Sequence, residues 1–209
     1  MRVYTCRRAA EPIAIDGMLD DDAWAQAEAV PLRLHDDSGF PTMETLARLC
    51  YDNEHLYVSF ECRDTEIQAT WTNRDDPIFK EEVVEIFLDP DSDLLEYYEF
   101  EVSPRNVVFD ATVKNPTGAK CELDTSWDCA GFNSAVRIDD AGNWRAELAI
   151  PFSSLETAPN SSPRPGDQWR MNLYRIERVP AQEYMCWSPT LAEPANFHVP
   201  GRFGILRFE

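Results

Sequence analysis

The sequence predicts an all-β protein, an antiparallel β-sandwich of the jelly-roll or immunoglobulin-like kind with one short N-terminal helix. Two observations predict this fold. About ten segments of five to eight residues alternate apolar with polar side chains, the spacing at which a strand turns successive side chains to opposite faces of a sheet. Segments rich in Gly, Pro, Asp and Asn separate them. The chain has 209 residues, 44% of them hydrophobic, and is expected to form a single domain over residues 1–209.

The N-terminal segments predict a helix followed by a hairpin. The helix is expected because Asp20 or Asp21 provides an N-cap and the carboxylates that follow favour the positive end of the helix dipole. The hairpin is expected because two alternating runs flank the turn formers Asp52–Glu54. The elements in order are a short strand from Ile13, a turn at Asp16–Gly17, a helix ending near Val30–Pro31, and strands at Thr45–Tyr51 and His55–Glu61.

Two acidic strands form the most informative part of the chain, because their carboxylates alternate with large apolar residues. In the first strand one face carries Val83, Glu85, Phe87 and Asp89, and the other carries Val84, Ile86 and Leu88. In the second, one face carries Tyr97, Glu99, Glu101 and Ser103, and the other carries Tyr98, Phe100 and Val102. Neighbouring strands of this kind are expected to bury one face and to line the other with carboxylates among aromatic rings. Such a face suits a polyhydroxylated ligand, a hard cation, or both.

The C-terminal half continues the alternation. Gln168–Arg178 is the longest predicted strand, and Arg170, Asn172 and Tyr174 share one of its faces, which is expected either to meet the carboxylate-lined cleft or to be an ordinary polar outer face. The other expected elements are a strand at Asn106–Val113, a loop at Lys114–Thr125, a hairpin of Asn133–Asp139 and Asn143–Ile150, a helical turn at Pro151–Leu155, a loop at Thr157–Gly166 and a closing strand at Phe203–Phe208.

A run of aspartates between the two acidic strands is a candidate calcium site. Asp89, Asp91 and Asp93 alternate along the loop, with Glu96 just beyond, and Ca²⁺ takes six to eight oxygen ligands from clusters of this type. The alternative is a solvated turn, since Asp, Pro and Ser are turn formers. A second candidate combines Asp75–Asp76 with Asp64 or Glu66.

The net charge of −19 excludes some classes of partner. Nucleic acid and anionic membranes are not expected to bind, because their phosphates would be repelled, and no run is long enough to insert in a membrane. The N-terminus lacks the apolar core of a signal peptide, which predicts the cytoplasm, or secretion if a leader has been removed. The six cysteines include no Cys-x-x-Cys pair and are interpreted as core residues, with a Cys121–Cys129 bridge as the alternative.

Seven motifs occur along the chain: Ile15–Trp24, Leu49–Val58, Val84–Asp89, Tyr97–Val102, Trp144–Pro151, Trp187–Pro189 and Arg202–Leu206. In this order and spacing they resemble carbohydrate-binding module family 9 and its stand-alone relatives. The resemblance covers nearly the whole chain and implies a β-sandwich, structural calcium, and binding of a mono-, oligo- or polysaccharide in a cleft flanked by aromatic side chains, often at the end of a glycan. It also implies a glycoside hydrolase as a partner, because the best-known members are appended to such enzymes.

The resemblance assigns site residues and also shows where this chain departs from the family. Phe79 and Phe197 stand where two tryptophans clamp the sugar in sugar-binding members, which implies a weaker contact because Phe offers less stacking area. The acidic ligand residue is kept as Glu85, and Glu101 replaces a basic one. The remaining implied positions are Asn172, which is kept, and Tyr174, which replaces an amide.

Three functions are compatible with these patterns, and the first, a non-catalytic sugar-binding module, is favoured. His198 beside Phe197 is then expected to donate a hydrogen bond to a ligand hydroxyl, while Glu85, Glu99 and Glu101 accept such bonds. The second is a small glycoside hydrolase that uses a pair of these carboxylates. The third is a haem-binding sandwich with Met171 or Met185 as the axial ligand.

Overall fold

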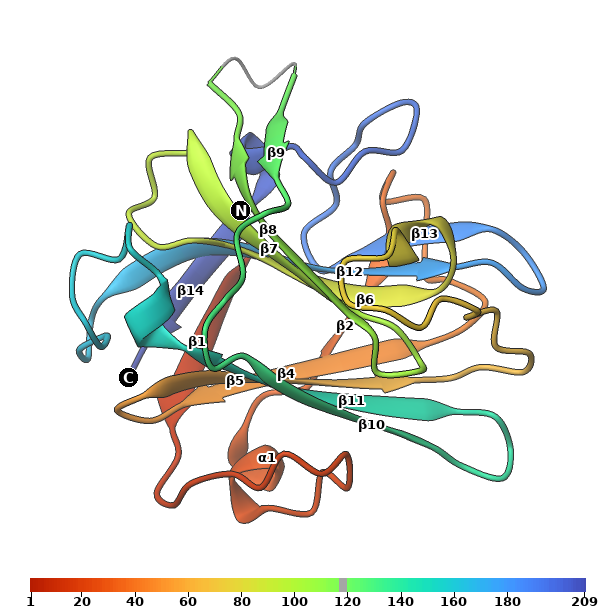
Figure 1. The fold of residues 1–209 in the computed structure, drawn as a ribbon, viewed down its shortest axis with the longest axis horizontal. Helices are drawn as coiled ribbons and strands as arrows, with labels where there is room; N and C mark the ends of the chain where they lie inside the picture. The colour runs from red at the N-terminus through yellow and green to blue at the C-terminus, as the bar shows by residue number, and fades with distance from the viewer. Residues whose placement is uncertain (117–119) are drawn as a thin grey trace.

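The computed structural model describes residues 1–116 and 120–209 and shows two stacked β-sheets with the short helix α1 (Asp22–Gln26) below them (Figure 1). We call the sheet nearer α1 the lower sheet and the other the upper sheet. The predicted sandwich is therefore confirmed. Residues 117–119, which belong to the predicted loop Lys114–Thr125, lie outside the described residues, and a short strand occupies the end of that loop.

The lower sheet is antiparallel and contains the predicted hairpins. Its spatial order is β10 (Asn133–Ile138), β11 (Trp144–Pro151), β5 (His55–Cys62) and β4 (Thr45–Tyr51), with β2 (Val30–Pro31) beside β4.

The upper sheet carries the two acidic strands at its centre. Its order is β14 (Gly204–Phe208), β12 (Gln168–Glu177), β6 (Val83–Asp89), β7 (Glu96–Val102), β8 (Val108–Lys114) and β9 (Glu122–Asp124), with β13 (Glu183–Cys186) pairing with β12 and with β3 (Arg33–Leu34).

The first strand, β1 (Val3–Arg8), joins the two sheets. Its residues Val3–Cys6 pair in parallel with β14 of the upper sheet, and Arg7–Arg8 pair in parallel with β4 of the lower sheet. Three single turns of 3₁₀ helix complete the described elements: Ile78–Lys80, Phe152–Ser154 and Pro200–Arg202. No helix among the described residues is long and apolar enough to cross a membrane.

The two faces of the acidic strands are buried in two different apolar clusters. The face with Val84, Ile86 and Leu88 packs into the main core between the sheets, as the alternation predicts. The opposite face is also largely covered, because Phe87 and Tyr97 belong to a second cluster on the outer side of the upper sheet. Residues of that cluster from outside the central strands include Ile78, Phe197 and Phe203. This outer face is thus open only at a cleft, which is described below.

The helix is shorter than the sequence predicts. It begins after Asp21, one of the two expected caps, but Ala27 already has extended backbone geometry and the helix ends at Gln26. The early end lets the chain turn back so that Val30 and Leu32 reach the main core. The cysteines are free thiols, and five of the six are buried, which agrees with their interpretation as core residues.

Candidate functional site

A cleft with a volume of about 430 Å³ opens on the outer side of the upper sheet. The register explains why the acidic residues meet there: Glu85 on β6 lies directly opposite Glu101 on β7, and Glu99 lies opposite Phe87. The residues that line the cleft are Phe79, Lys80, Glu85, Phe87, Glu99, Glu101, Leu123, Ile176, Arg178, Tyr184, Ala195, Asn196, Phe197 and His198. Six of the nine ligand-binding residues proposed from the sequence are among them.

The three glutamates form the floor of the cleft. Their side chains are 2%, 4% and 1% exposed for Glu85, Glu99 and Glu101, and one oxygen of each lies within 4.8 Å of one oxygen of the others. Burial raises the pKa of Glu99 to about 7 and raises the pKa values of Glu85 and Glu101 well above the ordinary range. Like charges on directly opposite strand positions destabilise a sheet, so this floor requires protons or a cation to offset its charge.

Two phenylalanines form part of the cleft wall, and they differ in how much they are exposed. Phe79 is 38% exposed and contacts Phe109 edge to face, with ring centroids 6.0 Å apart. Phe197 is only 8% exposed and stacks on Tyr174, with centroids 4.2 Å apart and an angle of 15° between the planes. Phe79 therefore offers much more free ring surface than Phe197. Of the two rings proposed to stack on a sugar, one is therefore exposed and the other is largely covered.

His198 lies at the edge of the cleft and is held by two contacts. Its Nδ1 atom is 2.9 Å from the hydroxyl oxygen of Tyr97, and its backbone carbonyl accepts a hydrogen bond of 3.2 Å from the Asn115 side chain. Burial lowers the pKa of His198 to about 4, so the imidazole is neutral at physiological pH. A neutral imidazole in this position has one ring nitrogen that Tyr97 does not occupy.

Several residues of the cleft were missed by sequence reasoning, and Arg178 is the most important. Its guanidinium donates hydrogen bonds to the backbone oxygens of Phe79 and Glu81, at 2.8 and 3.3 Å, and to the hydroxyl of Tyr184 at 3.3 Å. It therefore fixes the segment that carries Phe79. The only feature of the sequence that could have indicated Arg178 is its position at the end of the predicted strand Gln168–Arg178. Strand alternation does not show which end of a strand lies at the cleft, so this feature was not sufficient.

Three proposed ligand residues do not line the cleft, and this corrects their predicted placement. Asn172 is fully buried, donates to the carbonyl of Ser188 at 2.8 Å and accepts from the Ser188 backbone N–H at 2.8 Å. Tyr174 is fully buried beneath Phe197 and donates to its carbonyl at 3.0 Å. Arg170 is half-buried and donates to the carbonyl of Phe203 at 3.2 Å. The three residues lie on the outer face of β12 as expected, but the segment that follows β13 covers them.

The aspartate loop brings together three of the four residues proposed as calcium ligands. One carboxylate oxygen from each of Asp89, Asp91 and Asp93 lies within 4.8 Å of the others, and Oδ1 of Asp89 is buried without a hydrogen-bond partner among the described residues. Burial raises the pKa of Asp89 to about 7. Glu96 is outside this group, with its carboxylate 4.0 Å from the ammonium nitrogen of Lys114. The three aspartates fit a calcium ion, which Glu96 would not contact directly.

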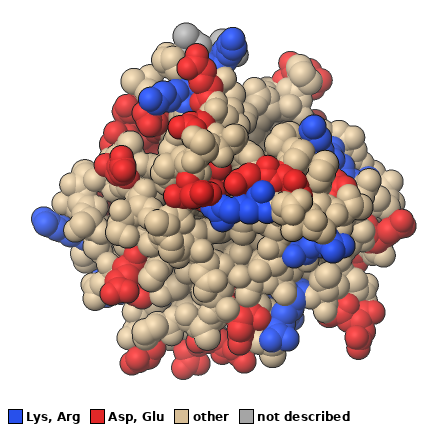
Figure 2. Space-filling model, viewed as in Figure 1, with Lys and Arg blue, Asp and Glu red and all other residues tan. Residues whose placement is uncertain are grey.

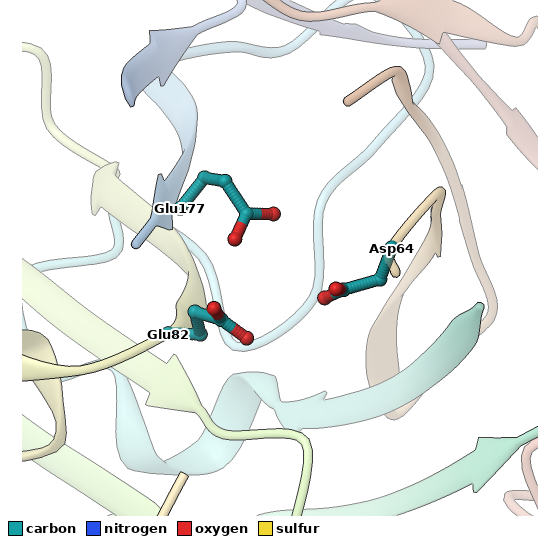
Figure 3. Close-up of side chains that lie close together, drawn as sticks. All are labelled: Asp64, Glu82 and Glu177. Carbon is teal, nitrogen blue, oxygen red and sulfur yellow. The ribbon is translucent and has the colours of Figure 1, made fainter. Parts of the chain in front are cut away.

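A second group of buried carboxylates lies between the sheets at one end of the sandwich. Figure 3 shows Asp64, Glu82 and Glu177 with their carboxylates turned toward one another. Arg175 is fully buried among them and forms ion pairs with Asp64, at 3.1 Å, and with Glu177. Burial, and then the neighbouring Glu177, raise the pKa of Glu82 to about 8. One arginine and one proton therefore offset two of the three negative charges that this group could carry.

This raised pKa predicts that Glu82 makes stability depend on pH. Between about pH 4.5 and 8 the unfolded chain releases the Glu82 proton while the folded protein keeps it, so the free energy of unfolding falls as the pH rises through this window. The variant Glu82→Gln is expected to remove about 1–3 kcal/mol of that fall. Urea unfolding at pH 5.5 and 8.0 measures it, with the exposed Glu122→Gln as the control. An unchanged pH dependence in Glu82→Gln would contradict the assignment.

A third group contains Asp75, Asp110 and Asp128, and it corrects the second calcium candidate. Asp75 is not gathered with Asp76, Asp64 or Glu66 in any acidic group among the described residues. Instead Arg74 lies among the three carboxylates, with nitrogen–oxygen distances of 3.8 Å to Asp75, 2.5 Å to Asp110 and 2.7 Å to Asp128. A basic side chain therefore already occupies this group.

The residues required by the two alternative functions are buried. Met171 and Met185 are fully buried in the main core between the sheets and line none of the described surface cavities, so neither faces a space for haem. The glutamates needed for hydrolysis expose at most 4% of their surface.

On the face shown in Figure 2, Asp and Glu lie around much of the periphery, and Lys and Arg form fewer patches, in agreement with the acidic composition.

Comparison with known proteins identifies the family to which the chain belongs. A family model described as carbohydrate-binding family 9 matches residues 14–208. The chain is 30% identical over 189 residues to an extracellular protein of Arthroderma benhamiae, covering 83% of this chain and 81% of that protein. It is 26% identical over 144 residues to the exoglucanase XynX of Acetivibrio thermocellus, covering 68% of this chain but 12% of the enzyme.

The fold is also found in solved structures of a family 9 module from Caldicellulosiruptor kristjanssonii. The complex of that module with cellotriose superimposes with a TM-score of 0.72 at 18% identity and covers all of this chain and 94% of the module. Its complex with glucose gives a TM-score of 0.71 at 17% identity and covers 96% of the module. At these identities the likeness shows the fold alone.

Proposed function

Since the chain belongs to carbohydrate-binding family 9, we propose that it is a non-catalytic module that binds a sugar or the end of a glycan in the cleft on the upper sheet. The observation that carries this proposal is the combination of an exposed aromatic ring, Phe79, with recessed carboxylates in one cavity. An apolar wall with a few convergent polar groups is typical of a small-molecule site. The family 9 structures with cellotriose and glucose support the choice of ligand class.

The cleft supplies the two kinds of contact that a pyranose needs. The face of the Phe79 ring stacks on the axial C–H groups of the sugar, which form an apolar surface. Hydrogen bonds to hydroxyl groups come from polar side chains around the rim, where Lys80 and Asn196 are exposed and Arg178 and His198 are half-buried. With one exposed Phe in place of two Trp, binding is expected to be weak, with a sub-millimolar Kd or about −4 to −5 kcal/mol.

The test of this function is the variant Phe79→Ala. Loss of the stacking surface is expected to weaken binding of cellotriose by about 1–2 kcal/mol, or roughly tenfold, because aromatic contacts of this type carry that order of energy. Isothermal titration calorimetry measures the affinity. Phe40→Ala is a matched control, because Phe40 is 63% exposed but does not line the cleft. Equal affinities of both variants, or no binding of any glycan on a broad array, would contradict the proposal.

We also propose structural calcium at Asp89, Asp91 and Asp93. The ion would satisfy the buried Oδ1 of Asp89 and hold the loop between β6 and β7, the strands that carry the cleft glutamates. Adding 1 mM CaCl₂ to chelator-treated protein is expected to raise Tm by several degrees, since a ligand that binds only the folded state stabilises it. The double variant Asp91→Asn/Asp93→Asn should lose most of this shift. An undiminished shift in the variant would place the stabilising ion elsewhere.

A glycoside hydrolase is the proposed partner. The chain matches a segment that makes up only 12% of exoglucanase XynX, which is how a non-catalytic module appended to an enzyme would align. In that arrangement the module holds the enzyme near its polysaccharide and raises the effective concentration of substrate.

A further inference from the structure

Among the described residues there are four groups of three neighbouring carboxylates, and they differ in whether a basic side chain pairs with them. Arg175 pairs with the group of Asp64, Glu82 and Glu177, and Arg74 pairs with the group of Asp75, Asp110 and Asp128. Among the described residues, no Lys or Arg nitrogen lies within 4.0 Å of the carboxylates of the other two groups. These are the aspartate loop, for which calcium is proposed above, and the cleft floor of Glu85, Glu99 and Glu101.

The cleft floor also contains unsatisfied oxygens, which are a separate observation. Oε1 of Glu85, Oε2 of Glu99 and Oε2 of Glu101 are all buried and have no hydrogen-bond partner among the described residues. Each of these side chains is at least 96% buried and borders the cleft. Buried carboxylate oxygens without partners are costly, and native proteins normally satisfy them with a donor, a water or an ion.

The nearest basic side chains do not satisfy these oxygens. Arg178 borders the cleft, but its hydrogen bonds go to Phe79, Glu81 and Tyr184. Lys80 also borders the cleft, is exposed, and forms no ion pair within 4.0 Å among the described residues. The aromatic rings that surround the floor supply no donor to the glutamates. The charge of the floor is therefore offset either by protons on the glutamates or by a cation that binds from outside the chain.

We propose that Glu85, Glu99 and Glu101 bind a hard divalent cation at the floor of the cleft, and that this cation in turn binds vicinal hydroxyls of the sugar. The second half of the proposal rests on the proposed function, and the first half does not. Two oxygens bound to one Ca²⁺ at 2.3–2.6 Å are at most about 5 Å apart, and the three glutamate oxygens lie within 4.8 Å of one another. Three carboxylates leave part of a six- to eight-oxygen shell free.

The position of the floor explains why an ion suits it better than direct sugar contact. With 1–4% exposure, the carboxylates are too recessed for a pyranose to reach all three, whereas an ion is small enough to enter between them. The ion would present its free coordination positions upward, on the side of the cleft where the exposed Phe79 ring stacks. The sugar would then be held by stacking and by two hydroxyl–metal bonds.

Calcium stoichiometry tests the metal half without any sugar. Calorimetric titration of chelator-treated protein with CaCl₂ is expected to give two sites, of which Asp91→Asn/Asp93→Asn loses one and Glu85→Gln/Glu101→Gln loses the other. Gln keeps the shape of a protonated Glu, and a thermal melt of the variant verifies that it folds. The loop variant Asp91→Asn/Asp93→Asn gives an independent result, because it keeps the cleft glutamates and is expected to bind one Ca²⁺. This result does not depend on whether the glutamate variant folds. No remaining Ca²⁺ in the loop variant would overturn the proposal.

The sugar half is tested in the loop variant, where only the cleft ion remains. Cellotriose is expected to bind at least tenfold more weakly after chelation than with Ca²⁺ present. Equal affinity with and without Ca²⁺ would overturn the role of the ion and leave the sugar-binding function intact. Calcium binding at the glutamates with no sugar bound under any condition would overturn the function and leave the metal site. If chelator-treated protein bound glucosamine more tightly than glucose, the proposed metal ion would also be contradicted. The ammonium group of the sugar would then be the cation that the carboxylates bind.

Discussion

Replacing Arg175 by methionine is expected to lower the free energy of unfolding by about 3–5 kcal/mol, the usual cost of removing one partner from a buried ion pair. Arg175 is fully buried, and besides its pairs with Asp64 and Glu177 it donates to Oγ1 of Thr45 at 3.0 Å and to the carbonyl of Arg63 at 2.8 Å. Without the guanidinium, two buried carboxylates lose their cation and two acceptors lose a donor. Urea unfolding at pH 7 measures the loss.

A variant on the same strand provides the control for this prediction. Arg170→Met removes a half-buried arginine of β12 whose hydrogen bond to Phe203 is partly exposed, so its cost should stay below about 1 kcal/mol. Similar losses in the two variants would show that Arg175 is not the internal cation of this group.

A second large loss of stability, about 2–4 kcal/mol, is expected for Glu147→Gln. Glu147 is fully buried on β11 and accepts four hydrogen bonds from the segment that contains α1: from the backbone N–H groups of Asp16 (2.9 Å), Gly17 (2.6 Å) and Leu19 (3.2 Å) and from Nε1 of Trp24 (2.9 Å). The amide of Gln offers only one acceptor oxygen and turns an NH₂ group toward donors. Hydrogen bonds to a charged group contribute about 1.5–3 kcal/mol each, so several are weakened at once.

Amide hydrogen exchange checks the Glu147 prediction at the segment that it holds. Exchange at Asp16–Leu19 should speed up by at least tenfold in Glu147→Gln. Glu61→Gln is the matched control, because Glu61 lies on the neighbouring strand β5 but is half-exposed, and surface ion pairs contribute about 1 kcal/mol or less. Unchanged exchange at Asp16–Leu19 would mean that Glu147 does not anchor this segment.

The sequence predicted the central strands well because their signal is local. A period of two residues assigns Val84, Ile86 and Leu88 to one face and Glu85 and Phe87 to the other without any knowledge of the rest of the chain, and both assignments are confirmed. The position of Glu85 opposite Glu101 depends on the register of the pair, which the alternation makes plausible but does not fix.

The covering of the outer face could not be predicted in this way. The residues after β13 that cover Asn172 and Tyr174 form loops with no periodic pattern, and they are brought there by hydrogen bonds such as that between Asn172 and Ser188. The partners of Arg175 and Glu147 are likewise far away in the sequence, with Asp64 111 residues from Arg175 and Gly17 130 residues from Glu147. Single-sequence patterns do not reveal such contacts.

The motifs that carried the family resemblance prove to be mainly structural. Trp24 and Glu147, from two different motifs, are hydrogen-bonded to each other. Trp187 packs so closely on Gly204 that a Cβ atom there would lie 2.2 Å from its ring. These contacts explain why the fold was recognisable from the sequence.

Chemical-shift mapping with cellotriose tests the central claim, a sugar site on the outer side of the upper sheet, most directly. In titrations of isotope-labelled protein with Ca²⁺ present, the account predicts saturable shifts at the amides of Phe79–Lys80 and Asn196–His198 and none in the lower sheet. Shifts confined to the lower sheet or to the aspartate loop, with the cleft amides unmoved at saturating sugar, would contradict it.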